Sequence, residues 1–340
     1  MEFVGMVLLS LFQIAAFFAA AFAVTIFFTP ILIDSARRKK IFGRDVNKPS
    51  RPEVANWGGF CIFAGIASGI LLAILYVVFI NPDLGNAILL LASLASITLL
   101  ALIGIFDDVF KLSWKTKALM PIIGAFPLVA ITAGNTTASI PFLGEVNFGL
   151  LYTFVLVPLG ITGAANAVNM AAGYNGIEAG TIAVISTFLL LIAFQSGSFP
   201  AVVILAVTLA ACLAFLKYNW FPSKVFPGDI GTLTLGAAVA SAVILGNMEK
   251  FGVILFIPAF YELAATLYYV RKGVVRRNAC HNPVIAKDGK LSPPKGAENY
   301  TLFYKILSRK PMREEDLVKT VLALYAFFGL VALAIFYSGA

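Results

Sequence analysis

The sequence predicts an all-α fold, a polytopic membrane bundle of about ten transmembrane helices that forms a single membrane-embedded domain over residues 1–340. Its composition excludes a soluble fold, because 60% of the residues are hydrophobic and only 12% are charged, whereas soluble domains carry about 25% charged residues. Ten apolar runs approach the length of about 20 residues that a helix needs to cross a bilayer. The basic residues also cluster in loops that alternate spans would place on one side.

The apolar runs are expected to form the spanning helices in chain order. They cover residues 3–33, 57–80, 87–105, 118–133, 149–166, 178–195, 199–217, 231–246, 250–270 and 316–338. The first run has no basic residue ahead of it and ends in a basic cluster, so we interpret it as a membrane helix rather than a cleaved signal. The runs at 118–133 and 231–246 are the shortest and contain proline or glycine, so length alone supports them least.

The distribution of Lys and Arg sets the expected orientation. With ten spans, five loops share one face: 34–56, 106–117, 166–178, 218–230 and 271–315. Of the 25 Lys and Arg residues, 24 lie in or beside these loops, and only Lys250 falls on the opposite face. Basic loops stay in the cytoplasm, so we expect these loops to form a functional cytoplasmic face and both termini to lie outside. The net charge of +8 attracts anionic headgroups or phosphates, and we find no nucleic-acid-binding motif.

Smaller elements are expected outside the spans. The external loop 134–148 alternates between polar and apolar residues, which predicts a small hairpin. Residues 298–309 form an amphipathic pattern that fits a helix lying at the membrane interface. Its apolar face consists of Tyr300, Phe303, Ile306 and Leu307. Cys61 and Cys212 lie inside apolar runs without metal-type spacing, so we interpret them as buried packing residues.

Two adjacent carboxylates, Asp107 and Asp108, end the third apolar run. The simplest interpretation is a solvated helix end. Ionisable residues at membrane depth are nevertheless functional candidates, and paired carboxylates suit Mg²⁺, which shares its coordination with substrate phosphates. Lys117 follows at the start of the next run, where it could neutralise phosphate charge. Trp114 fits an interfacial anchor.

An Asn-rich segment follows the fifth apolar run. Asn166 and Asn169 are three residues apart, so they share one helix face. Gly173 and Asn175 follow in a loop. Amide oxygens can ligate Mg²⁺ and amide donors can hold a base or a sugar, but a polar turn rich in Asn and Gly explains the same residues equally well.

Two further candidates lie in the later basic loops. Asp229 opens an apolar helix after Phe226-Pro-Gly, where it is either a helix N-cap or a metal ligand facing the other acids. His281 is the only histidine and lies in a basic loop after Arg276 and Arg277. A single histidine is usually structural or solvated, but this one could contact a diphosphate. All four sets of residues fall in loops of one face, which suits phosphoryl transfer by positioning and charge neutralisation.

Taken in order, these motifs resemble the polyprenyl-phosphate N-acetylhexosamine-1-phosphate transferase superfamily, of the glycosyltransferase 4 type. The resemblance covers nearly the whole chain, and it is strongest to the archaeal and eukaryotic branch of dolichyl-phosphate GlcNAc-1-phosphate transferases, because the bacterial branches carry several histidines in the last loop. The segments that match are Asp107-Asp108-Val109 with Trp114 and Lys117, Asn166-Ala167-Val168-Asn169, Gly173-Tyr174-Asn175-Gly176, Phe226-Pro227-Gly228-Asp229, and Cys280-His281 with Lys287-Asp288-Gly289-Lys290-Leu291.

The resemblance implies an enzyme that transfers GlcNAc-1-phosphate from UDP-GlcNAc to a polyprenyl (dolichyl) phosphate and releases UMP, the first membrane step of lipid-linked glycan assembly for protein glycosylation. It implies Mg²⁺, or Mn²⁺ in its place, held by Asp229 and Asn169. The implied catalytic set is Asp107, Asp108, Lys117, Asp229 and His281. The implied substrate-binding set is Asn166, Gly173, Asn175, Phe226, Glu53, Trp114, Arg276 and Arg277, with Phe226 stacked on uracil and with Gly173 and Asn175 lining the uridine pocket.

The chain departs from the family pattern at two places. The acid expected before the second helix could be Glu53, but Asn56 aligns about as well. The last loop carries Cys280 and Asn282 beside its histidine, where the family has arginines. Arg276 or Arg277 would have to take their place, so the groups that recognise the sugar stay open.

The sequence leaves two alternative functions open, and it also suggests where in the cell the protein is located. A transporter or lipid flippase would place ionisable groups near the membrane midplane, where only Glu262 lies in this sequence. A nearer rival is the same reaction on another UDP-N-acetylhexosamine. We expect an integral protein of a prokaryotic plasma membrane, with an archaeal host favoured, or of the endoplasmic reticulum if the host is eukaryotic. The resemblance also implies a homodimer.

Overall fold

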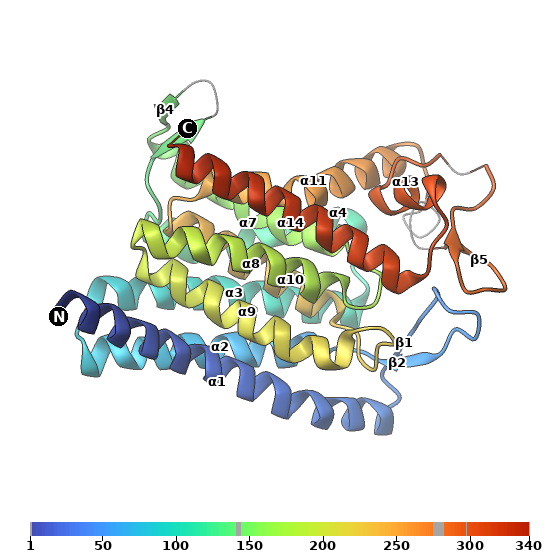
Figure 1. Ribbon diagram of the computed structural model, residues 1–340, viewed down its shortest axis with the longest axis horizontal. Helices are drawn as coiled ribbons and strands as arrows, with labels where there is room; N and C mark the ends of the chain where they lie inside the picture. Colours follow the sequence, from blue (N-terminus) through green and yellow to red (C-terminus); the bar gives the residue numbers. More distant parts are fainter. Residues whose placement is uncertain (1, 141–143, 275–281, 297, 340) are drawn as a thin grey trace.

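The computed structural model describes residues 2–140, 144–274, 282–296 and 298–339. Its long helices lie side by side in one bundle (Figure 1). Within the described residues, nine helices are long and apolar enough to cross a membrane, which confirms the all-α membrane fold. They are α1 (Glu2–Arg38), α2 (Gly59–Leu75) continued by η1 (Tyr76–Ile80), α3 (Leu84–Phe110), α7 (Val157–Met170) preceded by η2 (Tyr152–Leu156), α8 (Ile177–Ser196), α9 (Phe199–Asn219), α10 (Gly228–Leu245), α11 (Glu249–Arg271) and α14 (Glu314–Ser338).

The fourth expected span is present as three short helices rather than one. α4 (Trp114–Leu119), α5 (Pro121–Gly124) and α6 (Phe126–Ala130) follow one another along a single helical path. Pro121 and Pro127 interrupt this path, because a proline has no amide hydrogen to donate to the preceding turn. With this path included, the described chain crosses the bundle ten times, and both of its ends lie at the same pole (Figure 1).

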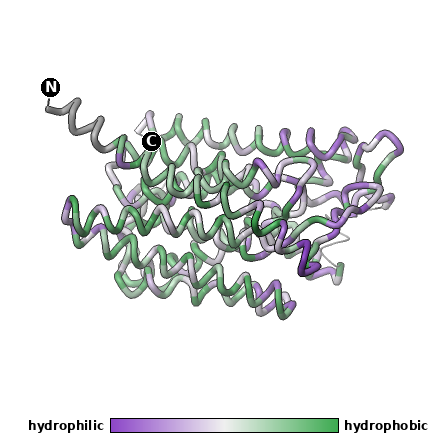
Figure 2. Tube along the Cα trace, turned by 90° about the horizontal axis from the view of Figure 1, so that it is seen from below, coloured by the Kyte–Doolittle hydropathy of each residue, from purple (hydrophilic) through white to green (hydrophobic). Residues whose placement is uncertain are grey.

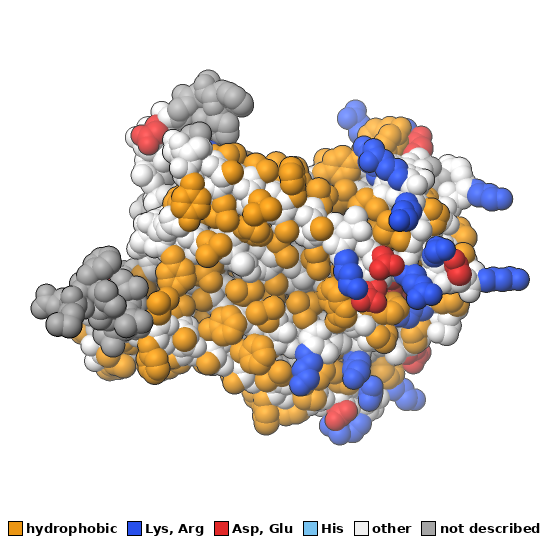
Figure 3. All heavy atoms as spheres, in the orientation of Figure 1, with side chains coloured by type: hydrophobic (Ala, Val, Ile, Leu, Met, Phe, Trp, Pro, Cys, Tyr) orange, Lys and Arg blue, Asp and Glu red, His pale blue; other side chains and the backbone are white. Residues whose placement is uncertain are grey.

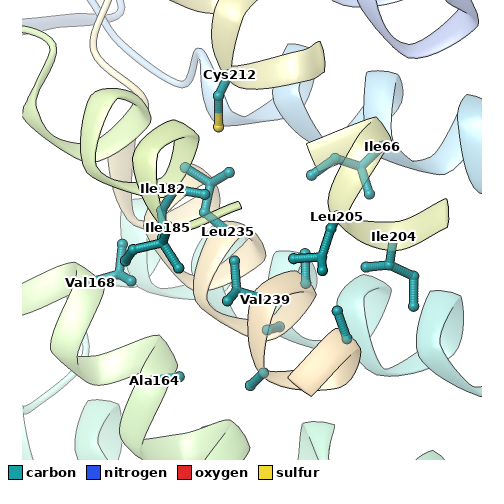
Figure 4. Packing of buried hydrophobic residues seen from close by; sticks show 14 of the residues in the cluster. Ile66, Ala164, Val168, Ile182, Ile185, Ile204, Leu205, Cys212, Leu235 and Val239 are labelled. Atoms are coloured by element: carbon teal, nitrogen blue, oxygen red, sulfur yellow. The ribbon is translucent and has the colours of Figure 1, made fainter. Parts of the chain in front are cut away.

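α10 lies at the centre of the bundle. All but three of its 18 residues are buried, and it packs against α2, α3, α7 and α9. The contact with α7 is close, because a Cβ atom at Gly236 would lie 2.5 Å from the Cα atom of Ala165. Figure 4 shows Leu235 and Val239 of α10 beside Leu205 of α9. Small residues allow such approach between membrane helices, and the packing holds the first residues of α10 near the bundle axis.

The surface divides into an apolar belt and one charged pole. Figure 3 shows apolar side chains over the middle of the bundle and Lys and Arg side chains gathered at one end. The backbone trace separates in the same way, with hydrophilic segments at that end (Figure 2). We call this end the basic face. It is built from the described residues of the loops 34–56, 106–117, 166–178, 218–230 and 271–315, and the ends of several spans, α1 and α3 among them, extend into these loops.

Three short hairpins lie outside the spans. They pair β1 (Phe42–Arg44) with β2 (Glu53–Ala55), β3 (Thr137–Ile140) with β4 (Gly144–Asn147), and β5 (Val284–Ile285) with β6 (Leu291–Ser292). The second of these confirms the hairpin expected in the external loop. The first brings the loop after α1 to the loop before α10, because Ala55 bridges Val225 in parallel.

The amphipathic segment of the last loop packs on protein rather than at the membrane interface. It forms α13 (Leu302–Arg309), in which Phe303, Tyr304 and Leu307 are buried. The expectation of an interfacial helix was wrong, because an amphipathic pattern does not tell a lipid surface from an apolar protein surface. Tyr300 is 46% exposed. Cys61 and Cys212 are buried and free, as expected for packing residues.

Candidate active site

Lys117 joins two carboxylates that come from different helices. Its ammonium group forms ion pairs with Asp107, in the last turn of α3, and with Asp229, in the first turn of α10, where Nζ lies 3.1 Å from Oδ2. Asp107 also accepts a hydrogen bond from the amide of Leu112 at 3.0 Å, which fixes the turn between α3 and α4. Three charged groups from three separate helices therefore meet at one point.

Asn169 ties α7 to the same site. Its side-chain amide donates to Oδ1 of Asp229 at 2.6 Å and to Oγ1 of Thr232 at 3.0 Å. Thr232 lies one turn after Asp229 on α10, and its hydroxyl donates to the carbonyl of Asp229 at 3.2 Å. Asp229 is therefore held at both oxygens, by Lys117 at one and by Asn169 at the other.

The charges of the group favour a protonated lysine. Burial lowers the pKa of Lys117, but the charges and hydrogen bonds of Asp229 and Asp107 outweigh it, so the pKa is raised above its usual value. Lys117 precedes the apolar part of its span, and its side chain is 34% exposed. With both carboxylates ionised, the three groups carry one net negative charge, which would attract a cation.

Two buried oxygens beside Gly228 lack hydrogen-bond partners among the described residues, namely Oδ2 of Asp108 and Oδ1 of Asn56. A Cβ atom on Gly228 would lie 2.6 Å from the first and 3.2 Å from the second. Buried acceptors without a donor are costly. This pair is therefore suited to a cation or to a hydroxyl group of a ligand.

Asp108, Asn56 and Gly228 border a cavity of about 460 Å³ at the basic face. Phe226 and Pro227 form one part of its wall, and Gly173 and Tyr174 form another. The remaining lining residues are mostly polar: Arg44, Asp45, Val46, Asn47, Asn56, Asp108, Asn169, Ala172, Asn175, Glu178, Gly228, Asp229 and Thr232. Its size falls within the range of about 300–1,000 Å³ typical of small-molecule sites.

A second charged network supports the part of the cavity wall that contains Asp45 and Asn175. Lys48 forms ion pairs with Asp45 and with Glu314, where Nζ lies 3.2 Å from Oε2. Lys48 also donates to Oδ1 of Asn175 at 2.7 Å. The same oxygen accepts from the amide of Ser223 at 2.8 Å, and the side-chain amide of Asn175 donates to Asp45 at 3.1 Å. The Asn175 side chain, predicted to touch uridine, thus joins three segments of the basic face.

Three other predicted residues lie apart from the cavity wall. Asn166 donates to the carbonyls of Ala118 at 3.1 Å and Thr162 at 3.0 Å, so it links α7 to α4. Trp114 is 57% exposed at the start of α4. Glu53 is exposed on β2, whereas Asn56, the alternative, lines the cavity. The structure therefore favours Asn56 over Glu53.

The last loop is described only in part. His281, Arg276 and Arg277 lie outside the described residues, so their predicted roles stay predictions. Asn282 follows directly, and its amide donates to the hydroxyl of Tyr304 at 3.1 Å.

Sequence reasoning missed several residues that line or support the cavity. Thr232 is three residues after Asp229 on an apolar helix, and this spacing could have marked it. Asp45 and Lys48 lie in the polar segment of the first basic loop, in which only Glu53 and Asn56 were considered as site residues. Glu314 begins the last span, where an acid also suits a helix N-terminus, so the sequence gives no signal for its pairing with Lys48.

A family model described as glycosyl transferase family 4 matches residues 90–247. This segment contains the acidic pair, Lys117, the Asn-rich segment and Asp229. The match therefore includes every residue of the site that comes from α3, α4, α7 and α10.

The chain is also similar to curated proteins along most of its length. It is 34% identical to a Sulfolobus acidocaldarius protein over 269 residues, 78% of this chain and 81% of that protein. It is 32% identical to a Saccharolobus solfataricus protein, with 75% and 78% covered, and 28% identical to a Dictyostelium discoideum protein, with 67% and 65% covered. The Dictyostelium protein is named UDP-N-acetylglucosamine–dolichyl-phosphate N-acetylglucosaminephosphotransferase, and the two archaeal proteins carry the same name marked as putative.

Proposed function

The chain belongs to glycosyl transferase family 4, the polyprenyl-phosphate N-acetylhexosamine-1-phosphate transferase superfamily, and we propose that it transfers GlcNAc-1-phosphate from UDP-GlcNAc to a dolichyl-type polyprenyl phosphate. The products are polyprenyl-diphosphate-GlcNAc and UMP. Its archaeal and eukaryotic relatives carry the name of this activity, which favours UDP-GlcNAc over other UDP-N-acetylhexosamines. Membership of a transferase family also removes the support for a transporter or flippase.

One observation carries the proposal: Lys117, Asp107, Asp229 and Asn169 meet beside a polar cavity at the basic face. Four different helices supply these residues, and none of the four would be needed at the same point for packing alone. Charge neutralisation and positioning are what phosphoryl transfer demands of a protein. The site has the residues for both.

In the proposed reaction, an oxygen of the lipid phosphate attacks the sugar-side phosphorus of UDP-GlcNAc. The new phosphorus–oxygen bond forms as the bond from this phosphorus to the bridging oxygen breaks, and UMP leaves. A phosphate monoester carries about −1.5 to −2 charge at pH 7, so it can attack without a strong base. Lys117 offsets charge on the reacting phosphates, and Asp107 and Asp229 hold its ammonium in place.

We propose Mg²⁺ as the cofactor, with Mn²⁺ able to replace it. The donor set fits, because hard cations take carboxylate and amide oxygens and Asp229, Asp107 and Asn169 lie together. The unpartnered oxygens of Asp108 and Asn56 add two more donors nearby. Asp229 and Asn169 would hold the ion, and the Asn169 amide would have to turn its oxygen toward Asp229. When bound, the ion would neutralise diphosphate charge.

The cavity walls suggest how the nucleotide would lie. Phe226 offers a ring to stack on uracil, and Gly173 lines the wall without a side chain. The backbone amide of Gly173 donates to Glu178 and its carbonyl accepts from Asn47, so Gly173 would shape the uridine pocket rather than bond to the base. Asn175 also lines the cavity, but its side chain is bonded to Asp45 and Lys48, so it would hold the wall in shape rather than bond to the base. His281, Arg276 and Arg277 remain proposed contacts of the diphosphate and sugar, and Arg44 is a further basic residue at the cavity.

A second cavity suits the lipid chain. It measures about 530 Å³ and lies between η2, α7, α10 and α11. Its walls include Leu159 and Gly160 of α7 and Phe256 and Phe260 of α11.

The protein is an integral membrane protein, and we propose that its basic face is cytoplasmic. This orientation follows from the concentration of Lys and Arg in the loops of that face. An archaeal plasma membrane is the proposed location, because two of the relatives are archaeal. A homodimer is proposed from the family resemblance alone.

Release of UMP by the purified protein tests the proposed function. Protein in lipid nanodiscs with Mg²⁺, UDP-GlcNAc and dolichyl phosphate should release UMP, and excess EDTA should stop the release. Asp229→Asn should lose the activity, whereas Glu298→Gln, at an exposed ion pair with Lys272, should keep it. UMP release from UDP-GalNAc but not from UDP-GlcNAc would refute the sugar assignment, and no release from any nucleotide sugar would refute the reaction.

A further inference from the structure

Glu262 is a buried carboxylate inside a spanning helix. It lies in α11, and its side chain has no exposed surface. Burial of an acid in a membrane helix is costly unless the group is hydrogen-bonded or paired. Glu262 is not part of the site described above, so it needs a separate explanation.

The carboxylate of Glu262 holds the beginning of α13. Its Oε2 accepts a hydrogen bond of 2.7 Å from the amide of Leu302, the first residue of that helix. A helix N-terminus has unsatisfied amide hydrogens and a partial positive charge, both of which suit a carboxylate. The neighbouring Tyr261 donates from its hydroxyl to the carbonyl of Tyr300 at 2.6 Å. Two successive residues of α11 thus anchor the chain that leads into α13.

α13 in turn packs against the wall of the substrate cavity. The ring of Phe303 lies 4.6 Å, centre to centre, from the ring of Tyr174. Tyr174 lines the cavity between Gly173 and Asn175. The hydroxyl of Tyr304 accepts a hydrogen bond from the amide of Asn282. α13 therefore joins α11 to both the cavity wall and the last loop.

We infer that Glu262 is a positioning residue: by holding the N-terminus of α13, it keeps Phe303 against Tyr174 and so sets the affinity of the cavity for the nucleotide sugar. The acid serves a loop of the basic face rather than a path across the membrane. The inference rests on the proposed function for its kinetic readout, but the docking of α13 can be measured without turnover.

Two pairs of variants test the hydrogen bond from both of its ends. Glu262→Ala removes the acceptor, whereas Glu262→Gln keeps a carbonyl oxygen. Leu302→Pro removes the donor without strain, because proline suits the first helical position and Thr301 already has the extended conformation that precedes proline (φ −69°, ψ 148°). Leu302→Ala controls for the lost side chain.

The kinetic readout is UMP release at varied UDP-GlcNAc. Glu262→Ala and Leu302→Pro should each raise KM about tenfold, which corresponds to the loss of one buried hydrogen bond, with a smaller change in kcat. Glu262→Gln and Leu302→Ala should stay within about twofold of wild type. The double variant Glu262→Ala/Leu302→Pro should equal either single variant, because both remove the same bond.

Limited trypsin digestion supplies the readout that needs no activity. Lys305 is exposed in the middle of α13, so cleavage after it requires that the helix opens locally. Glu262→Ala and Leu302→Pro should be cut there faster than wild type, while cleavage after the exposed Lys40, in the first basic loop, should not change. Unchanged KM and unchanged cleavage in both variants would overturn the inference, as would a Glu262→Gln protein that behaves like Glu262→Ala. If wild type releases no UMP, the proposed function fails and the digestion still tests the docking.

Discussion

The Nζ atom of Lys117 lies 3.1 Å from Oδ2 of Asp229, although 112 residues separate them in the chain. The same ammonium contacts Asp107, so it occupies the position between two carboxylates that a cation would otherwise take. Phosphate groups that enter the cavity would find a positive charge already fixed at this point. The ion pairs therefore connect the architecture of three helices to the chemistry of the site.

Lys117→Met should abolish most of the activity. Loss of one fixed charge that stabilises a phosphoryl-transfer transition state costs about 100-fold to 1,000-fold in kcat. UMP release at saturating substrates measures the effect. Lys115→Met, at an exposed residue of the same helix, should keep normal turnover. A Lys117→Met protein with turnover within about tenfold of wild type would contradict the assigned role.

Above neutral pH, the stability contributed by Lys117 should change only at alkaline values. Its pKa is raised in the folded protein above the usual 10.5, so its ion pairs stabilise the fold fully below that value and lose their effect as pH rises past the folded pKa. The difference in Tm between wild type and Lys117→Met should therefore be constant from neutral pH to about pH 9 and shrink only above the pKa. A difference that already shrinks between pH 7 and about pH 8 would show that the pKa is lowered instead.

Gly228→Ala should harm both stability and activity. Gly228 has φ +66°, and its added Cβ would meet Oδ2 of Asp108 at 2.6 Å. Gly289→Ala is the matched control, because Gly289 has φ +79° but no atom within 4 Å of its added Cβ. The control should lose about 1 kcal/mol from backbone strain alone and keep full activity.

Thermal unfolding and UMP release compare these two glycine variants. Gly228→Ala should lose more than about 2 kcal/mol, because contact with a buried carboxylate adds to the strain. It should also lose turnover. Equal stability losses and full activity in both variants would mean that the space above Gly228 is not part of the site.

The convergence of Asp107, Asn169 and Asp229 could be predicted from the sequence. The lengths of the apolar runs place the helix ends, and the basic loops place all three residues on one face. The fourth span was also expected, but its division at Pro121 and Pro127 was not, because proline inside a run can either bend or end a helix.

The contacts of Asn175 could not be predicted in the same way. Its partners Asp45, Lys48 and Glu314 come from distant segments, and Glu314 is 139 residues away. The conformation of the loops decides which residues pair, and loop conformation leaves no periodic pattern in the sequence. The choice between Glu53 and Asn56 depended on the same information, because the register of β2 sets which residue faces the cavity.

Lys48→Met should destabilise the basic face. It would leave Asp45 and Glu314, both buried, without their shared cation, and breaking a buried ion pair costs about 3–5 kcal/mol. The exposed pair Lys319–Glu315 provides the comparison, and Lys319→Met should cost less than about 1 kcal/mol. Chemical denaturation measures both, and similar losses for the two variants would contradict the structural role of the network.

Asn166→Ala distinguishes a positioning role from a substrate contact. Asn166 was predicted to bind substrate, but its side chain donates to the carbonyl of Ala118, the residue next to Lys117. Removal of this hydrogen bond should let α4 shift and misplace the Lys117 ammonium. A displacement of about 1 Å can cost up to about 100-fold in rate, so kcat should fall while the KM for UDP-GlcNAc stays unchanged. A substrate contact would instead raise KM.

A double variant provides a second test of the role of Asn166. Asn166→Ala/Lys117→Met should be no slower than Lys117→Met alone, because the amide acts only through the lysine. A further loss of rate in the double variant would indicate that Asn166 contacts the substrate.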